Sequence, residues 1–290
     1  MTDYLTTREL AQLLRIKERK VYDLAASGEV PCSRATGKLL FPRQEIEAWI
    51  AAGRTGPKPA ALSRPSVVLG SHDPLLEWAL RESRAGLATY LDGSTDGLDR
   101  FAHHEGVATG IHIRNPASGE WNVPAVVQRF ADQPVVLIEW ARRQRGLIIN
   151  PSLTSKPKGI ADLPGLRFAA RQEESGTQLL LRDLLRASSI DPAELNVTAI
   201  ARSEADVALL VLEGRADVSF GLMSLATQYR LDFAPVIEER FDLLADRRAW
   251  FDPPLQSLIR FCQNKTFEAR AAAFTGYDVS GFGRVHFNGA

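Results

Sequence analysis

The chain has 290 residues, 45% of them hydrophobic, and its 35 Lys and Arg balance its 35 Asp and Glu. This length and composition predict two or more cored domains and exclude a largely disordered chain. Because the net charge is zero, nothing attracts the chain as a whole to nucleic acid, and any DNA affinity must come from a local basic patch.

The termini and the cysteines predict where the protein works. No basic-then-apolar leader opens the chain, and no apolar run approaches the roughly 18 to 20 residues of a membrane span. Cys32 and Cys262 lack metal-ligand spacing and are expected in different domains as free thiols, which favours a reducing compartment. We expect a cytoplasmic protein with no membrane partner.

The first 53 residues predict a small helical head. Thr6 and Glu9 have the spacing of a capping box, so a helix is expected to start there and run to about Arg15. A second helix is expected over residues 17–27, with Gly28 as its left-handed stop. A hairpin turning at Gly37 and a third helix follow. Apolar residues recur at the spacing of one buried face in each helix: Leu10, Leu13 and Leu14; Val21, Leu24 and Ala25; Ile46, Trp49 and Ile50.

The outward face of this head carries side chains that can donate to phosphate oxygens and base edges. A short turn joins the first two helices, as in the helix-turn-helix. Each basic residue taken alone could equally belong to a solvated charged face. As a set, they are our DNA-binding candidates: Arg19, Lys20 and Tyr22 on the second helix, Arg34 and Lys38 on the hairpin, and Arg43 after it.

The order LTTRELAQLL, VYDLAASGEVP, a G-K-x-x-F hairpin and IEAWI resembles the excisionase-type winged helix-turn-helix, a relative of the MerR head. The resemblance covers Tyr4 to about Ala52. It implies that the Lys17–Ser27 helix enters the major groove of DNA while the wing touches the flanking backbone. The second helix departs from many relatives because it begins with Lys17 and Glu18, where they have a small hydroxyl cap.

A linker is expected between the head and the rest of the chain. The stretch GRTGPKPAALSRP, from Gly53 to Pro65, is rich in Gly and Pro and has no periodic apolar pattern. We therefore predict a winged helix-turn-helix DNA-binding domain over residues 1–53, a linker over 54–65 and a ligand-binding domain over 66–290.

Beyond the linker, short apolar strands alternate with helices, which predicts an α/β fold with mainly parallel sheet. The rhythm appears in SVVLGS then DPLLEWALRES, and again in LRFAARQ then SGTQLLLRDLL. Between the two halves, PVVLIEWARRQRGLIINP is long enough to cross from one sheet to another. Two α/β lobes are expected, with lobe 1 at about 66–140 and 245–290 and lobe 2 at about 141–244.

Several predicted strands end in hydroxyl, acidic or glycine residues that open the next helix. Helix N-termini present unpaired N–H groups and partial positive charge, so such turns can bind an anion at the carboxyl edge of a sheet. The alternative for each turn is ordinary N-capping. The ligand-binding candidates in these turns are Ser71, His72 and Asp73; Ser94 and Thr95; Ser175, Gly176 and Thr177; and Ser203.

This domain resembles the periplasmic-binding-protein-like domain of cytoplasmic regulators, a relative of molybdate- and tungstate-binding proteins. The most specific matching stretches are RQ-x-x-SGTQLLL and GRADVSFGL. The resemblance implies two lobes around a hinge near Glu139 to Arg143 and near Glu239 to Leu244, with the ligand between them. This domain departs from those relatives at Glu173 and Glu174, where the relatives often have a glycine. Two carboxylates there would repel an anion unless they point outward.

Two further residues are candidate ligand contacts. His112, at the end of the VATGIHI strand, is expected to face the ligand and donate to it. Arg143 could balance a bound anion or simply solvate the crossover segment. No H-E-x-x-H or C-x-x-C spacing predicts a metal site, and no cofactor is implied. Since no G-x-S-x-G motif, Walker-type loop or paired catalytic carboxylates appear, we expect no catalytic residues.

Together these features predict a ligand-responsive, DNA-binding transcription regulator. The expected fold is a winged helix-turn-helix joined to a two-lobed periplasmic-binding-protein-like α/β domain, acting as a homodimer or higher homo-oligomer on paired half-sites. The resemblance favours a molybdate- or tungstate-type oxyanion, and the alternative is an organic acid or molybdenum-cofactor fragment. An enzyme localised by its head and an architectural factor are the competing classes.

Overall fold

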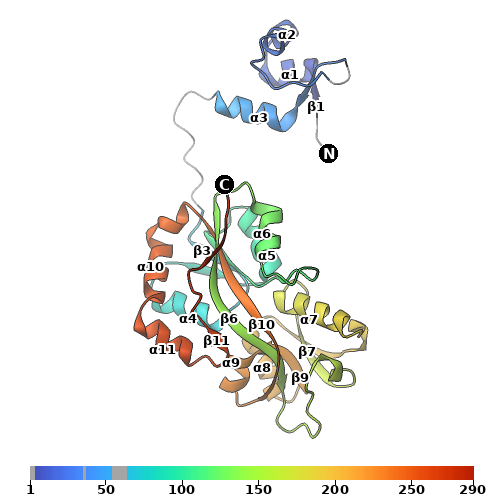
Figure 1. The fold of residues 1–290 in the computed structure, drawn as a ribbon, viewed down its shortest axis with the longest axis vertical. Coiled ribbons are helices and arrows are strands. Elements are labelled where there is room, and N and C mark those ends of the chain that lie inside the picture. The colour runs from blue at the N-terminus through green and yellow to red at the C-terminus, as the bar shows by residue number, and fades with distance from the viewer. Residues whose placement is uncertain (1–3, 35–36, 54–63) are drawn as a thin grey trace. The chain divides into compact units, whose positions relative to one another are not determined.

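The structure is a computed structural model that describes residues 4–34, 37–53 and 64–290. It forms two compact units, one within residues 1–63 and the other within residues 64–290 (Figure 1). Most of the predicted linker, residues 54–63, lies outside the described residues. Among the residues that are described, no helix is long and apolar enough to cross a membrane.

The first unit has two short strands and three helices. Its elements are β1 (Tyr4–Thr6), α1 (Thr7–Leu14), α2 (Glu18–Ala26), β2 (Leu40–Pro42) and α3 (Arg43–Ala52). The predicted capping box starts α1: the Thr6 backbone N–H donates to the Glu9 carboxylate at 2.7 Å, and the Glu9 N–H donates to Thr6 Oγ1 at 3.3 Å. Lys17 precedes α2 without a side-chain cap, which agrees with the missing hydroxyl in the sequence.

The predicted wing is a hairpin. The backbone N–H of Ser33 donates to the Leu40 carbonyl at 2.7 Å, and the Leu40 N–H donates to the Ser33 carbonyl at 3.0 Å. Gly37 turns the chain with a φ of +74°, which a glycine adopts without strain. The hairpin continues into β2, which pairs with β1, a strand that the sequence analysis missed.

The head core is smaller than the apolar spacing predicts. Its buried residues are Leu5, Leu10, Ala11, Val21, Ala25, Val30, Phe41 and Ile46. The predictions for Leu13 and Ile50 were wrong, because these side chains are 46% and 39% exposed. At about 100° per residue, burial of Leu10 with Ala11 centres the inner face of α1 away from Leu13, and Ile50 lies one turn past Ile46 near the end of α3.

One ten-stranded sheet organises the second unit, in the order β4-β3-β5-β10-β6-β9-β7-β8, with β11 and β12 also paired to β6. Its strands are β3 (Val67–Gly70), β4 (Ala88–Tyr90), β5 (Ala108–Ile111), β6 (Val135–Ile149), β7 (Arg167–Arg171), β8 (Asn196–Ala201), β9 (Val218–Leu222), β10 (Asp232–Asp246), β11 (Tyr277–Asp278) and β12 (Val285–Asn288).

Helices pack against this sheet around separate apolar cores. They are α4 (Pro74–Glu82), α5 (Ser94–Ala102), α6 (Val123–Phe130), α7 (Gly176–Ala187), α8 (Glu204–Leu212), α9 (Met223–Gln228), α10 (Pro253–Cys262) and α11 (Lys265–Ala272), with 3-10 turns η1 (Ile160–Asp162), η2 (Pro192–Glu194) and η3 (Ala249–Phe251). The sequence analysis did not predict α6.

Two lobes share the sheet, as predicted. In lobe 1 the neighbours β4, β3 and β5 are parallel, and in lobe 2 the neighbours β9, β7 and β8 are parallel. Between them, β6 and β10 run side by side and antiparallel for 15 residues each (Figure 1). The segment predicted to cross between sheets is therefore one long strand, and the two predicted hinge segments lie opposite each other, with Arg143 paired to Glu239.

The second unit begins at Arg64, a residue that the sequence analysis assigns to the linker. The Arg64 side chain donates to Asp246 at 3.0 Å and to the Phe101 carbonyl at 2.6 Å. Its guanidinium also lies 4.1 Å from the centre of the Phe101 ring. These contacts attach Arg64 to lobe 1.

Candidate ligand site between the lobes and candidate DNA surface

Polar side chains meet at the carboxyl ends of the strands from both lobes. Each would be costly to bury without a partner, because desolvation penalises an unpaired polar or charged group. We call this set the interlobe cluster: Ser71, Asp73, Ser94 and His112 from lobe 1, Arg143, Arg145 and Glu239 from the shared strands, and Arg171, Ser175, Thr177 and Glu204 from lobe 2, all buried.

The two lobes are in direct contact beside this cluster. Thr95 Oγ1 donates to the Glu174 carbonyl at 2.9 Å, and Gln172 Nε2 donates to the Asp92 carbonyl at 2.6 Å. A β-carbon on Gly176 would lie only 2.8 Å from Cε1 of His112. The absence of a side chain at Gly176 is thus what lets the start of α7 approach the end of β5.

Arg143 connects the shared strand β6 to lobe 1. Its Nη1 donates to Asp73 at 2.8 Å, and its Nη2 donates to Glu239 at 2.5 Å. Asp73 also accepts from Trp140 Nε1 at 3.1 Å and from the Tyr277 hydroxyl at 2.5 Å. Both Arg143 and Asp73, predicted as ligand contacts, are therefore bonded to protein partners in this structure.

Arg145 connects the same strand to lobe 2. It donates to both oxygens of Glu204 at 3.2 Å and to Glu239 at 2.7 Å. Thr177 Oγ1 donates to Glu204 at 2.6 Å. Burial alone would raise the pKa of Glu204, but the positive charges of Arg145 and Arg171 lower it to about 2.

His112 is held as a neutral imidazole. Burial lowers its pKa, although Glu239, 3.0 Å from Nδ1, opposes that shift. Since an ionised carboxylate only accepts hydrogen bonds, the ring proton belongs on Nδ1, and Nε2 is left as an acceptor. The sequence analysis expected His112 to donate to a ligand, whereas a neutral ring in this arrangement offers a ligand an acceptor.

Arg171, at the end of β7, was not among the sequence candidates. Its side chain is 6% exposed, and its Nε and Nη1 atoms have no hydrogen-bond partner among the described residues. Burial lowers its pKa, and the charge of Glu204 opposes that shift. Arg171 is the arginine that opens the RQ-x-x-SGT stretch, at the carboxyl end of a predicted strand, and that position was the available signal.

The serine candidates divide into two groups. Ser71 Oγ and Ser94 Oγ lie 2.7 Å apart inside the cluster, and Ser94 Oγ also accepts from the His112 backbone N–H at 3.2 Å. Ser175 and Ser203 cap α7 and α8 through the backbone N–H groups of Gln178 and Asp206. The N-capping alternative thus describes contacts that Ser175 and Ser203 make.

The acidic residues before α7 do not face the cluster. Glu173 and Glu174 are exposed, and Glu173 forms an ion pair with Arg182. The repulsion that Glu173 and Glu174 would exert on a bound anion is therefore weakened by solvent.

His72, a ligand candidate from lobe 1, has its Nε2 atom 3.0 Å from the Glu77 carboxylate.

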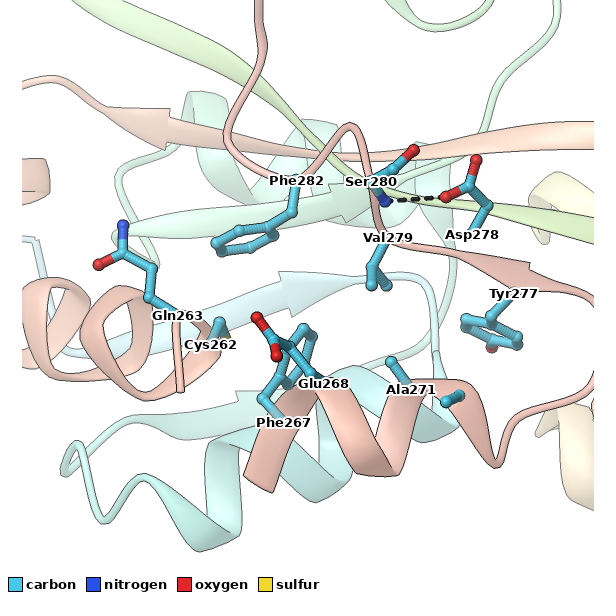
Figure 2. Close-up of a pocket in the computed structure, with 11 residues that line it drawn as sticks. Cys262, Gln263, Phe267, Glu268, Ala271, Tyr277, Asp278, Val279, Ser280 and Phe282 are labelled. Carbon is cyan, nitrogen blue, oxygen red and sulfur yellow. Dashed lines mark hydrogen bonds between the residues drawn. The ribbon is translucent and has the colours of Figure 1, made fainter. Parts of the chain in front are cut away.

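A separate hollow of about 630 Å³ lies on lobe 1, between α10, α11 and the segment around β11 (Figure 2). Phe267, Val279 and Phe282 contribute apolar surface to it, while Glu268 and Asp278 contribute carboxylates. These charges disfavour an anion there. Among the described residues, no group of three or more His, Cys, Asp or Glu side chains is arranged to hold a metal ion.

The head presents most of its DNA-binding candidates to solvent. Arg19, Lys20 and Tyr22 are exposed on α2, with Tyr22 52% exposed. On the wing, Lys38 is exposed, while Arg34 donates to the Ala25 carbonyl at 3.3 Å and so ties the wing to α2. Arg43 is partly buried at the start of α3. The structure thus places α2 and the wing side by side, as a two-part DNA contact requires.

Two relatives match this chain in sequence, one along nearly its whole length and one over part of it. Uncharacterized protein YvgK of Bacillus subtilis is 24% identical over 306 aligned residues, covering 98% of each chain. A Clostridium pasteurianum protein named for the 5′ region of a 2Fe-2S ferredoxin gene is 27% identical over 109 residues, which are 37% of this chain and 96% of that relative.

A solved structure shares the fold of the second unit. It is a Clostridium perfringens protein assigned as the substrate-binding protein of a phosphate ABC transporter, with bound phosphate. The TM-score is 0.54 at 13% identity, covering 71% of this chain and 96% of the other. At that identity the likeness shows the fold alone.

Family models match both units. A helix-turn-helix domain matches residues 4–54, and the PBP superfamily domain matches residues 77–263. Both are binding domains rather than catalytic ones. The chain therefore belongs to the PBP superfamily domain family and carries a helix-turn-helix domain ahead of that domain.

Proposed function

We propose that this protein is a ligand-responsive, DNA-binding transcription regulator that senses a small anion. The observation that carries the proposal is the joining of a helix-turn-helix domain to a two-lobed domain whose buried cluster draws side chains from both lobes. A molecule bound among those side chains contacts both lobes, so it favours one arrangement of the lobes over others.

DNA binding is assigned to α2 and the wing. Their exposed cations supply phosphate contacts, and the polar side chains of α2 are positioned to reach base edges. The test is a gel-shift series with the protein's own upstream DNA at low salt. The absence of any retarded band would refute DNA binding.

The ligand is a small oxygen-bearing anion, and the molybdate or tungstate type is the first candidate. The paired hydroxyls of Ser71 and Ser94, the start of α7 and the buried guanidinium of Arg171 support this assignment. A thermal-shift panel of molybdate, tungstate, sulfate, phosphate and small carboxylates tests it.

An organic acid or a molybdenum-cofactor fragment is the second candidate, favoured by the charge count of the cluster. Three arginines, at 143, 145 and 171, face three carboxylates, at 73, 204 and 239, while His112 is neutral. A singly charged ligand disturbs this balance less than a doubly charged one. Stabilisation by carboxylates with none by the tetrahedral oxyanions would support this candidate.

The regulator is proposed to work in the cytoplasm as a homodimer or higher homo-oligomer. One head of this size makes few base contacts, so two heads on paired half-sites are needed for specific binding. Ligand binding would then alter DNA affinity through the relative placement of the heads. Light scattering on the purified protein, with and without operator DNA, measures the number of chains in each complex. A single chain bound to DNA would refute the dimer.

A further inference from the structure

Among the described residues, Arg171 is the one arginine of the interlobe cluster whose Nε and Nη1 atoms both lack a hydrogen-bond partner, and this isolation has a structural cause. The carboxylate whose charge raises the pKa of Arg171 most belongs to Glu204, whose two oxygens already accept from Arg145 and Thr177. Glu239 is likewise taken by Arg143, Arg145 and His112. Glu204 and Glu239 therefore each accept three hydrogen bonds from donors other than Arg171.

A buried guanidinium with free donors is unfavourable for folding. An arginine taken out of water loses hydration, and that loss is repaid only by hydrogen bonds to acceptors. Nε and Nη1 of Arg171 have none among the described residues. Burial accordingly lowers the pKa of Arg171, in contrast to the raised pKa of its neighbour Arg145, which has carboxylate partners.

The position of Arg171 fits a ligand contact rather than a packing role. It ends β7, four residues before Ser175 caps α7, so its side chain and the helix N-terminus share one edge of lobe 2. Its pKa also responds to the charge of Asp92, in the lobe 1 loop that leads to Ser94. Arg171 therefore lies where lobe 2 meets the hydroxyl-bearing edge of lobe 1.

We propose that Arg171 is the residue that binds the negative charge of the ligand, with its free donors directed to the oxygens of a carboxylate, phosphate or related oxyanion. On this proposal Arg143 and Arg145 position the shared strands and do not bind the ligand directly. The inference rests on the proposed function, because it assigns a specificity-determining residue to the same anion-sensing site.

The test compares wild type with Arg171→Gln, Arg171→Lys and Arg202→Gln in the full chain. Arg202 is an exposed arginine on the same lobe, so its substitution controls for loss of one positive charge. Molybdate, phosphate and lactate serve as probes. The dissociation constant for each is measured by calorimetry, and the melting temperature is measured with and without each anion.

We expect Arg171→Gln to weaken binding of the anion that the wild-type protein binds by about tenfold to a hundredfold, as loss of a charge-assisted hydrogen bond does. Arg171→Lys should restore part of the affinity, and Arg202→Gln should match wild type. Without any anion, Arg171→Gln should melt at or above the wild-type temperature, since it removes an unpaired buried charge. A structural role for Arg171 predicts the opposite shift.

Two results overturn the proposal, and they differ in what else they overturn. If wild type binds one of the anions and Arg171→Gln binds it equally well, or if Arg171→Gln melts lower without anion, the assignment of Arg171 fails while anion sensing stands. If wild type binds none of molybdate, phosphate or lactate, both the assignment and the anionic ligand class fail.

Discussion

The buried Glu204 carboxylate lies against a hydroxyl at the start of α7 and against the guanidinium of Arg145. It accepts from Thr177 at the start of α7 and from both terminal nitrogens of Arg145. Because these partners favour the ionised form, the pKa of Glu204 is about 2, well below its ordinary value of 4.5. The same logic holds the pKa of Glu239 low.

A folded-state pKa below the unfolded one makes stability depend on pH in a fixed direction. The ionised Glu204 stabilises the folded protein fully above pH 4.5, and this contribution is lost as pH falls toward 2. We predict that Glu204→Gln lowers the free energy of unfolding at pH 7 by about 3 kcal/mol. Urea unfolding at pH 7 and pH 3 measures the difference, which should shrink at pH 3. A difference that stays constant with pH would contradict this account.

Gly176 offers a second test at the scale of one residue. A methyl group at this position would lie 2.8–2.9 Å from three atoms of His112, one of them the backbone carbonyl oxygen. We predict that Gly176→Ala keeps the lobes from closing and weakens anion binding at least about tenfold. Gly159→Ala is the matched control, since a β-carbon there meets nothing within 4 Å. Calorimetry with unchanged affinity in both variants would show that the close approach is dispensable.

The sequence analysis named the hydroxyl and histidine members of the cluster together with Asp73 and Arg143, but it did not predict which charged groups pair with one another. Ser71, Ser94 and Thr177 were recognisable because a strand end followed by a small hydroxyl residue is a local pattern. The partners of Arg143 and Arg145 were not, since Asp73, Glu204 and Glu239 come from distant parts of the chain. Only the pairing of the strands, which depends on tertiary structure, brings these charges together.

At the scale of elements, β6 shows what a strand period adds to a sequence motif. In a strand, alternate side chains point to the same face, so Arg143 and Arg145 share one side and Arg142 faces the other. The structure buries Arg143 and Arg145, while Arg142 is partly exposed and pairs with Glu238. Applying the two-residue period of a strand to the RRQR stretch would have separated the buried Arg143 and Arg145 from the more exposed Arg142.

Helix α2 carries the prediction for DNA binding. Arg19 and Lys20 are exposed on it, and each phosphate contact contributes about 0.9 to the slope of log affinity against log salt. We predict that Arg19→Ala combined with Lys20→Ala weakens operator binding about tenfold or more and flattens that slope by up to about 2. Fluorescence anisotropy across a salt series measures both quantities.

The control for this variant is Gln12→Ala, which changes an exposed residue of α1. The melting temperature of both variants should match wild type, because exposed helix substitutions change stability little. An unchanged salt slope in the double variant would move the DNA contact away from α2.

At the scale of the whole molecule, the order of helices and strands along the chain could be predicted, but the pairing of the strands into one sheet could not. Local signals, such as the capping box at Thr6, the Gly37 turn and the strand-helix alternation, located nearly every element. The single mixed sheet was missed because β6 and β10 read as boundaries between lobes, whereas each is one 15-residue strand belonging to both. Long-range pairing of this kind leaves no local trace in one sequence.

Arg64 supplies a prediction about the second unit as a whole. Its side chain bonds Asp246 and two backbone carbonyls of lobe 1. We predict that Arg64→Ala lowers the free energy of unfolding by about 2 kcal/mol or more, since it leaves these acceptors without their donor. Anion affinity should not change, because Arg64 contacts no member of the interlobe cluster. Urea unfolding and calorimetry measure the two effects, and Arg248→Ala, an exposed neighbour of Asp246, is the control. A loss of anion affinity in Arg64→Ala would show that the anchor reaches the ligand site.

Because Arg64 is attached to lobe 1, the number of residues between it and the head limits the distance that the linker can span. Only the ten residues 54–63 separate the described end of the head from this fixed point, and ten residues span at most about 35 Å when fully extended. That reach is close to the 34–36 Å between half-sites one turn of DNA apart. In the proposed dimer, adding or removing residues between 53 and 64 would change which operator spacings the two heads can occupy, without altering a single contact inside either unit.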